Sequence, residues 1–258
     1  MSEAAVPSSS SESFTRSEGH RRWVRICHWI GVLSFFTLGV TGVFILAVHP
    51  RLYWGEVGND LMPALLAIPI SDNHRPGEFE QTVSFTDVSD TAFSANRTYE
   101  IFNQNGWGRS LHFLAAWFLV IVGLFYGLAG LISGHIKRDL VPGVRELAPR
   151  ALWQDLKIHV ALQFRSAGGG PPYGLLQRCA YASVAFVALP LMFITGLAMS
   201  PAVTAAFPIL LDVFGGYQSA RTIHFFGFAA LVLFLVVHVA MVVLTGFRQQ
   251  LRAMILGN

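Results

Sequence analysis

Four long apolar runs constrain the fold of this chain more than any other feature. They cover Val24–Val48, Trp107–Ser133, Leu175–Ser200 and Ser219–Gly246. Each reaches the roughly 20 residues that an α-helix needs to cross the hydrocarbon core of a bilayer. Only 13% of the residues are charged and 53% are hydrophobic, whereas a soluble domain carries about 25% charged residues. The sequence therefore predicts an all-α fold, a transmembrane four-helix bundle.

Basic residues gather on one side of this predicted bundle. Thirteen of the 18 lysines and arginines lie before the first run or at its start, between the second and third runs or at the start of the third, or after the fourth. The positive-inside rule assigns that side to the cytoplasm. We therefore expect an up-down-up-down bundle with both termini cytoplasmic. The basic residues form no groove-sized patch, so we expect no nucleic-acid partner.

Two segments lie outside the predicted spans. Residues 1–19 are rich in serine and lack a hydrophobic pattern, which predicts a disordered cytoplasmic tail ahead of one membrane domain at 20–258. Residues 49–106 form a long periplasmic loop in this topology, with eight acidic residues against three arginines. Connections of this length are usually functional. We expect the loop to be a docking surface for a periplasmic partner.

Four of the nine histidines fall inside the predicted spans, where ionisable side chains are rare and usually functional. A single intramembrane histidine is as readily a hydrogen-bonded packing residue. Their depths form a pattern, since His28 and His238 belong near the cytoplasmic face and His112 and His224 near the periplasmic face. His238 follows His224 by about 21 Å along the helix and is about 40° short of four full turns, so both face the bundle interior.

Two imidazoles at one depth match the two axial positions that a porphyrin leaves open on its iron. The pairs His28 with His238 and His112 with His224 therefore predict two haems, one near each face. Zinc would need three or four converging ligands. A proton relay remains an alternative, although such relays usually use acidic residues, and none lies deep in these spans.

Three arginines each precede a predicted ligand by three residues, which places them one helical turn closer to water. Haem propionates would emerge there, and guanidinium groups pair well with carboxylates. An interfacial or snorkelling role is the alternative, and for Arg25 it is an equally good explanation. The predicted propionate partners are Arg25, Arg109 and Arg221.

Glycines predict helix surfaces that leave room for a flat macrocycle. Gly42 follows His28 by 14 residues and so lies at the depth of the periplasmic haem. Gly196 lies on the third helix, which has no histidine. Both are candidate haem-packing positions, although small residues also serve plain helix contacts in membranes. Cys27 and Cys179 are the only cysteines, with no C-x-x-C-H motif for covalent haem attachment, and we expect no disulfide.

The motifs Arg25-Ile-Cys-His28-Trp29 and Gly108-Arg109-Ser-Leu-His112, with the His224 to His238 spacing, resemble a known family. It comprises the membrane cytochrome b (gamma) subunits of formate dehydrogenases and their cytochrome b561-like relatives in thiosulfate reductases and nickel-iron hydrogenases. The resemblance covers all four helices, including Val40-Thr-Gly42 and Ile194-Thr-Gly196. It implies a dihaem b subunit of the bacterial inner membrane, with the same histidine pairs as ligands.

The resemblance also implies that electrons pass between a partner enzyme and the quinone pool. The segment His49-Pro-Arg-Leu-Tyr-Trp-Gly-Glu resembles cytochromes that accompany periplasmic molybdopterin oxidoreductases, which we take as the expected partner. Asp155, Lys157 and His159 are candidate quinone-site residues, or equally the polar face of a surface helix. Two alternatives stay open. One is a freestanding cytochrome b561, and the other is a membrane anchor or transporter without haem, which would show no Soret or alpha band.

Overall fold

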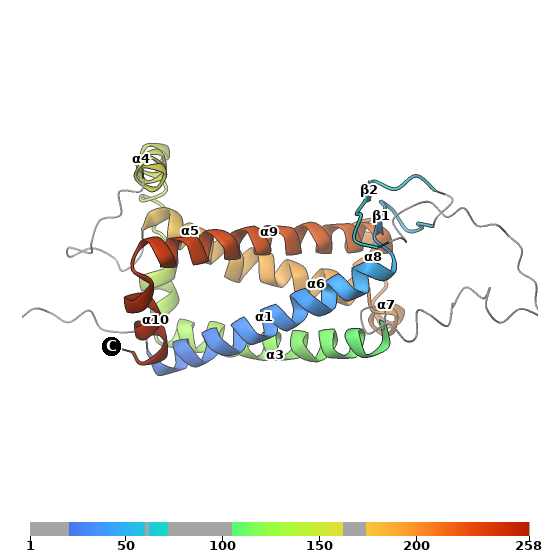
Figure 1. The fold of residues 1–258 in the computed structure, drawn as a ribbon, viewed down its shortest axis with the longest axis horizontal. Helices are drawn as coiled ribbons and strands as arrows, with labels where there is room; N and C mark the ends of the chain where they lie inside the picture. The colour runs from blue at the N-terminus through green and yellow to red at the C-terminus, as the bar shows by residue number, and fades with distance from the viewer. Residues whose placement is uncertain (1–20, 60–61, 72–104, 162–173, 258) are drawn as a thin grey trace, which may run out of the picture.

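The computed structural model describes residues 21–59, 62–71, 105–161 and 174–257 (Figure 1). The predicted tail at 1–19 and most of the predicted loop lie outside these residues. The described chain is mostly helical, with one short two-stranded sheet. Its elements lie around four long helical segments that run side by side (Figure 1).

The four predicted spans are confirmed as long apolar helices. They are α1 (Arg22–Val48), α3 (Asn105–Ile132), the run α5–η5–α6, and α9 (Tyr217–Leu244). The third span consists of α5 (Leu175–Ser183), the π-helical segment η5 (Val184–Ala188) and α6 (Leu189–Ala198). Each is long and apolar enough to cross a membrane. The predicted ends differ from these by two residues or fewer.

Proline accounts for the change of helix type in the third span. Pro190 has no backbone N–H, and in a regular α-helix its ring would clash with the carbonyl of the residue four positions earlier. The wider turns of η5 end directly before α6, which carries Pro190 in its first turn. A π-type bulge of this kind is an ordinary way to accommodate such a disruption inside a helix.

The outer surface of the four helices is apolar. Between 6% and 11% of the residues in the most apolar window of each span are buried inside the protein. Leu33, Leu124 and Leu233 are each at least 65% exposed. An exposed apolar surface of this extent is not stable in water, whereas hydrocarbon solvates it. The exposure therefore agrees with an integral membrane protein.

The interior contacts use small side chains. α1 packs mainly on α3, and α6 mainly on α9. Thr41 of α1, Thr195 of α6 and Ser219 of α9 are almost fully buried. Small polar residues at helix interfaces allow close backbone approach in membranes and supply hydrogen bonds there.

The remaining elements lie at the two ends of the long helices. Figure 1 places β1, β2 and α8 at one end and α4 and α10 at the other; we call these the β1 end and the α10 end. The strands pair antiparallel, with Arg51 opposite Ala67 and Leu52 opposite Leu66. The bounds are β1 (Arg51–Leu52), β2 (Leu66–Ala67), η4 (Ile136–Leu140), α4 (Pro149–Val160), α7 (Pro201–Ala206), α8 (Ile209–Phe214) and α10 (Phe247–Ile255).

At the α10 end, two side chains of α1 donate hydrogen bonds to backbone carbonyls of α10. Arg25 donates a hydrogen bond from its guanidinium to the carbonyl of Ile255 at 2.9 Å. The indole N–H of Trp29 donates to the carbonyl of Met254 at 3.2 Å. Because these carbonyls belong to the last turns of α10, the two side chains satisfy groups that a helix terminus leaves unpaired.

At the β1 end, residues 49–57 form a strap across the start of α9. The backbone N–H of Gln218 donates to the carbonyl of Gly55 at 2.9 Å, and the hydroxyl of Thr222 donates to the carbonyl of Tyr53 at 2.6 Å. Gly216 makes this close approach possible. Its φ of +114° is in the left-handed region, and a Cβ there would lie 2.5 Å from the carbonyl carbon of Gly55.

We predict that Gly216→Ala loosens the strap and destabilises the β1 end. The added Cβ meets backbone atoms, which cannot move aside as a flexible side chain can, and the positive φ adds a strain of about 2 kcal/mol. The thermal midpoint in detergent should fall by about 5 °C or more. The control is Gly123→Ala, because a Cβ at Gly123 meets nothing within 4 Å. Equal midpoints for the two variants would contradict this account of the strap.

Candidate functional site

His112 lies in the second turn of α3 and faces α1. Its Nδ1 is 3.0 Å from the hydroxyl oxygen of Thr41. The next residue of α1, Gly42, lies against the same ring, and a Cβ added there would be 3.5 Å from the Cε1 atom of His112. A threonine and a glycine that are adjacent in sequence thus contact one imidazole together.

His224 occupies the equivalent place in the second pair of helices. Its Nδ1 is 2.9 Å from the hydroxyl oxygen of Thr195 on α6. A Cβ added at Gly196 would be 3.7 Å from the Cε1 atom of His224. The Thr-Gly dipeptides of the first and third spans therefore contact the histidines of the second and fourth spans in the same way.

The hydrogen bonds of the two threonines determine which ring nitrogen carries the proton. The hydroxyl of Thr41 donates to the carbonyl of Thr37 at 2.7 Å, and that of Thr195 donates to the carbonyl of Leu191 at 2.7 Å. A hydroxyl has a single hydrogen, so at the imidazole each threonine accepts. The Nδ1 of each histidine must then carry the hydrogen, which leaves a free electron pair on Nε2.

The two rings are separated by a distance that suits one metal ion between them. The ring centroids of His112 and His224 are 6.4 Å apart, and the planes are inclined at 54°. Two metal–nitrogen bonds of about 2 Å, and about 1 Å from each nitrogen to its ring centre, give about 6 Å. Among the described residues no three His, Cys, Asp or Glu side chains form a metal-binding group. A two-ligand haem layer fits this arrangement, and a zinc site does not.

The two remaining candidate ligands lie toward the α10 end. His28 makes an edge-on contact with Trp29, with ring centroids 5.4 Å apart. His238 stacks on Phe234 at 5.8 Å, and its Nδ1 is 3.5 Å from the hydroxyl of Tyr181. The pairing of His28 with His238 on one iron stays a prediction.

The three arginines predicted to bind propionates lie in different surroundings. Arg221 is half-buried and donates to the backbone carbonyls of His49 and Arg51, which fixes the strap to α9. Arg25 donates to α10, as described above, and Arg109 is exposed. Two of these guanidinium groups therefore have a structural task in the protein. Their role toward a propionate stays a prediction.

Two features of the site could not be anticipated from residue patterns. The sequence identified Gly42 by its spacing from His28 and Gly196 as a glycine on the span without a histidine, but the hydrogen bonds of the preceding threonines depend on how the helices face one another. Arg51 is 5% exposed and donates to the carbonyl of Met62 at 2.9 Å, so it stabilises the segment that carries β1 and β2. Nothing in its sequence context distinguishes it from a surface arginine.

The sequence matches a known protein family and several named relatives. The family model of the prokaryotic cytochrome b561 matches residues 19–257. The chain belongs to this family. Membership implies haem b as the cofactor and agrees with the resemblance inferred from the histidine motifs. No solved structure matches the chain.

Three relatives of this cytochrome carry names that describe redox subunits. A putative protein-methionine-sulfoxide reductase subunit YedZ1 of Azospira oryzae is 38% identical over 57% of this chain and 69% of its own length. A probable Ni/Fe-hydrogenase B-type cytochrome subunit of Azotobacter vinelandii is 25% identical over 85% of this chain and 77% of its own length. A protein of the same name from Azotobacter chroococcum is 24% identical over 84% of this chain and 75% of its own length.

We predict that Thr41→Val and Thr195→Val each weaken haem binding at the β1 end. Valine keeps the shape of threonine but cannot accept the Nδ1 hydrogen, so the ligand loses its partner and its fixed orientation. Loss of such a partner typically lowers metal affinity 10- to 100-fold. Titration of the haem-depleted protein with haem, followed at the Soret band, measures the change.

Two further variants test the same prediction. Thr195→Ser retains the hydroxyl and should bind haem almost as the parent does. Thr245→Val removes a hydroxyl that donates to the carbonyl of Met241 in its own helix, and it should have no effect. Unchanged haem affinity in both Thr41→Val and Thr195→Val would show that these hydrogen bonds do not support the ligands.

Proposed function

We propose that this cytochrome is a dihaem membrane subunit that passes electrons between a redox enzyme at one face of the bilayer and the quinone pool. The observation that carries the proposal is the pair His112 and His224. Their rings lie 6.4 Å apart, and the threonine hydrogen bonds leave both Nε2 atoms free to bind iron. When bound, each haem would supply a one-electron ferric–ferrous couple.

The proposed topology is an up-down-up-down bundle. Contacts between Thr41 and His112, and between Thr195 and His224, join the late part of one helix to the early part of the next in both pairs. Tyr181, early in the third span, contacts His238, late in the fourth. These contacts support alternating helix directions. They also support two separate layers of histidines, because His224 and His238 are about 21 Å apart along one helix.

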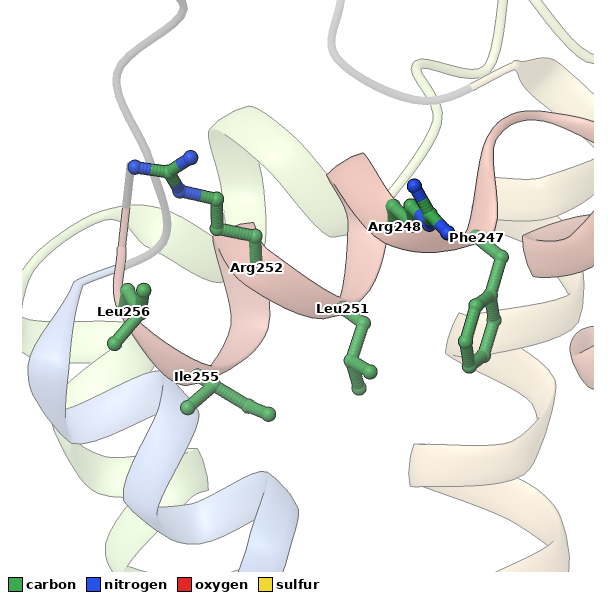
Figure 2. Close-up of a pocket in the computed structure, with 6 residues that line it drawn as sticks. All are labelled: Phe247, Arg248, Leu251, Arg252, Ile255 and Leu256. Carbon is green, nitrogen blue, oxygen red and sulfur yellow. The ribbon is translucent and has the colours of Figure 1, made fainter.

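We assign the α10 end to the cytoplasm and both termini with it. The positive-inside rule supports this side, since basic residues are concentrated there. α10 itself has the character of an interfacial helix. In Figure 2, Phe247, Leu251 and Ile255 project from one side of it and Arg252 from the other. An amphipathic helix of this kind lies along the membrane surface with its basic side toward lipid headgroups and water.

The residues of the chain have separate tasks in this function. His112 and His224 would bind the haem at the β1 end, and His28 and His238 the haem at the α10 end. Thr41 and Thr195 orient two of these ligands. Gly42 and Gly196 keep the adjoining helix surfaces free of side chains. The apolar helices exclude water from both layers, which favours electron transfer over side reactions with solvent.

The proposed partner is a periplasmic oxidoreductase that docks at the β1 end. Trp54, Val57 and Leu65 there are each at least 60% exposed, which suits a surface covered by another protein. The names of the relatives, subunits of hydrogenases and of a sulfoxide reductase, support a redox partner. We retain the molybdopterin class as the specific proposal, since it rests on the sequence at 49–56.

We place the quinone near the α10 end, close to the second histidine pair. Two of the residues proposed for it from sequence have structural partners. The carboxylate of Asp155 accepts a hydrogen bond from the backbone N–H of Leu176 at 2.8 Å. The ammonium group of Lys157 lies 5.5 Å from the centre of the Trp153 ring. Asp155 and Lys157 thus support α4 and the start of α5, and the quinone role of α4 remains a proposal.

We predict that single histidine substitutions remove one haem each. His112→Ala or His224→Ala should lower the haem content from two to one per chain. His28→Ala or His238→Ala should remove the other haem and leave the first. Pyridine haemochrome assays and redox titration of each purified variant measure the outcome. Loss of both haems from every single variant would contradict two independent layers.

The identity of the partner calls for a separate experiment. A pull-down of the tagged cytochrome from mildly solubilised membranes, followed by cofactor analysis, should recover a redox enzyme that contains molybdopterin. Recovery of nickel instead would replace the molybdopterin class with a hydrogenase. A cytochrome that loads haem and oxidises quinol without any stable partner would favour a freestanding cytochrome b561.

A further inference from the structure

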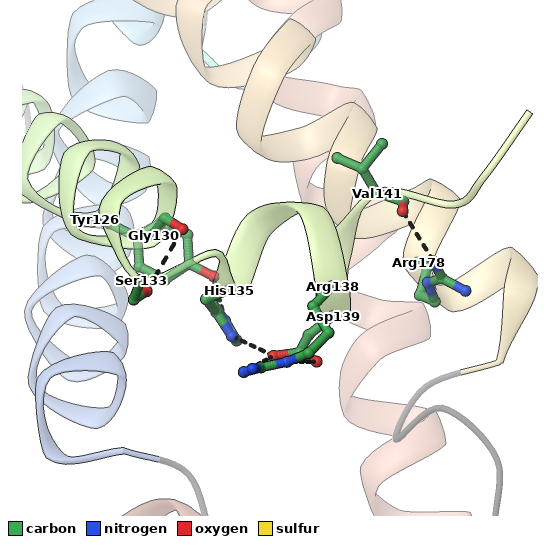
Figure 3. Close-up of polar contacts among 8 residues, drawn as sticks. All are labelled: Tyr126, Gly130, Ser133, His135, Arg138, Asp139, Val141 and Arg178. Carbon is green, nitrogen blue, oxygen red and sulfur yellow. Dashed lines mark hydrogen bonds and ion pairs between the residues drawn. The ribbon is translucent and has the colours of Figure 1, made fainter.

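A chain of polar side chains at the α10 end has no part in the haem sites described above. It links Tyr126 of α3, His135 just before η4, and Asp139 within η4. The hydroxyl of Tyr126 is 3.4 Å from Nε2 of His135. The Nδ1 of the same ring is 2.7 Å from Oδ2 of Asp139. Figure 3 shows His135 bonded to Asp139, with Arg138 beside Asp139.

The charge of Asp139 determines the hydrogen positions. Arg138 donates from Nε and Nη2 to the two carboxylate oxygens, each at 3.1 Å. These bonds, and to a smaller extent the bond from His135, hold the pKa of Asp139 below its ordinary value. An ionised carboxylate only accepts, so His135 donates from Nδ1. Its Nε2 then presents an electron pair to the hydroxyl of Tyr126.

The chain leads from water toward the predicted ligand His28. Arg138 is 61% exposed, whereas the side chains of His135 and Asp139 are 13% and 17% exposed. Trp23 of α1 packs on Tyr126 and His135, with centroid distances of 5.4 and 5.6 Å. Tyr126 also has Cys27, the neighbour of His28 in sequence, among its electrostatic neighbours. The inner end of the chain therefore lies close to the helix turn that carries His28.

We propose that Asp139, His135 and Tyr126 form a proton path between cytoplasmic water and a quinone that reacts at the α10 end. The path rests on the proposed electron-transfer function. Oxidation of one quinol breaks two O–H bonds and releases two protons and two electrons. The electrons leave one at a time toward the haem side, and the protons need a separate exit. Reduction of a quinone uses the same path in reverse.

Each proton moves by a defined exchange of hydrogens. The hydroxyl of Tyr126 takes a proton from the quinol and gives its own to Nε2 of His135. The resulting imidazolium, held by the carboxylate of Asp139, releases its Nδ1 proton to that carboxylate, which passes it to water. The ring then carries its hydrogen on Nε2, and it must exchange this for a hydrogen on Nδ1, by rotation or through water, before it can accept the next proton. The 3.4 Å contact between Tyr126 and His135 must shorten for the transfer, as catalytic hydrogen bonds often do once substrate is bound.

Ionisable groups from three elements adjoin His135 and Tyr126. Tyr126 is contributed by α3, Cys27 by α1, and Arg138 and Asp139 by η4. A purely structural role would be to hold η4 against the end of α3, because His135 and Asp139 are four residues apart on adjoining turns. The two roles differ in what they change. A structural contact affects stability, whereas a proton path affects the pH and isotope dependence of the reaction.

The test is reduction of the haems by a short-chain quinol, followed by stopped-flow absorbance in the purified full-length cytochrome. The variants are His135→Gln, Asp139→Asn and Tyr126→Phe. Each should slow quinol-driven reduction by about 10-fold or more, because a positioned proton carrier contributes at least that factor. His135→Gln should also change the pH dependence and the solvent deuterium effect of this step, because it removes a proton carrier. Reduction by dithionite, which needs no quinol proton, should be unchanged.

Glu146→Gln is the matched control. Glu146 is a carboxylate at the same end that pairs with Arg178 at 2.7 Å, and glutamine can still accept that bond. Its quinol kinetics should equal those of the parent. Parent-like rates and pH profiles in all three path variants, or loss of haem from all three, would overturn the proton path. If the parent protein itself accepts electrons from dithionite but never from quinol, the quinone function fails and the path fails with it.

Discussion

The candidate haem site depends on a hydrogen bond between a threonine and a histidine inside an apolar bundle, which is made once in each helix pair. In hydrocarbon a polar ring without a partner is costly, so an imidazole at this depth needs a neighbour that satisfies one nitrogen. Thr41 and Thr195 do so while their own hydroxyl hydrogens are bound to the preceding turn. Nε2 of each ring therefore keeps an electron pair that can bind a metal ion. The helix packing thus orients the imidazoles of His112 and His224 toward each other.

The same packing explains why the chain is assembled as two similar halves. In each half a Thr-Gly dipeptide on one helix faces a histidine near the start of the next, and the helices pack through small buried side chains. The strap from 49 to 57 and the hydrogen bonds of Arg25 and Trp29 to α10 then fix the two ends. Rigid ends around an apolar interior favour a fixed separation between the two histidine layers.

The sequence predicted the four spans well because a bilayer imposes both the length and the composition of a crossing helix. It also identified the histidines by their position inside the apolar spans, and Gly42 by its spacing of 14 residues from His28, which returns to nearly the same helix face. It did not predict the π-helical segment before Pro190 or the strap at the β1 end. It also did not anticipate that Arg25 and Arg221 bond to backbone carbonyls, or that Tyr126 and His135 lie under Trp23. Each of these depends on contacts between segments far apart in the chain.

The central claim is that each layer of two imidazoles holds one haem. The ratio of haem b to protein in the purified wild-type cytochrome, combined with its electron paramagnetic resonance spectrum, tests it most directly. We expect two haems per chain, both low-spin because imidazoles would fill both axial positions. A ratio of one, or a high-spin haem with an open axial position, would contradict it.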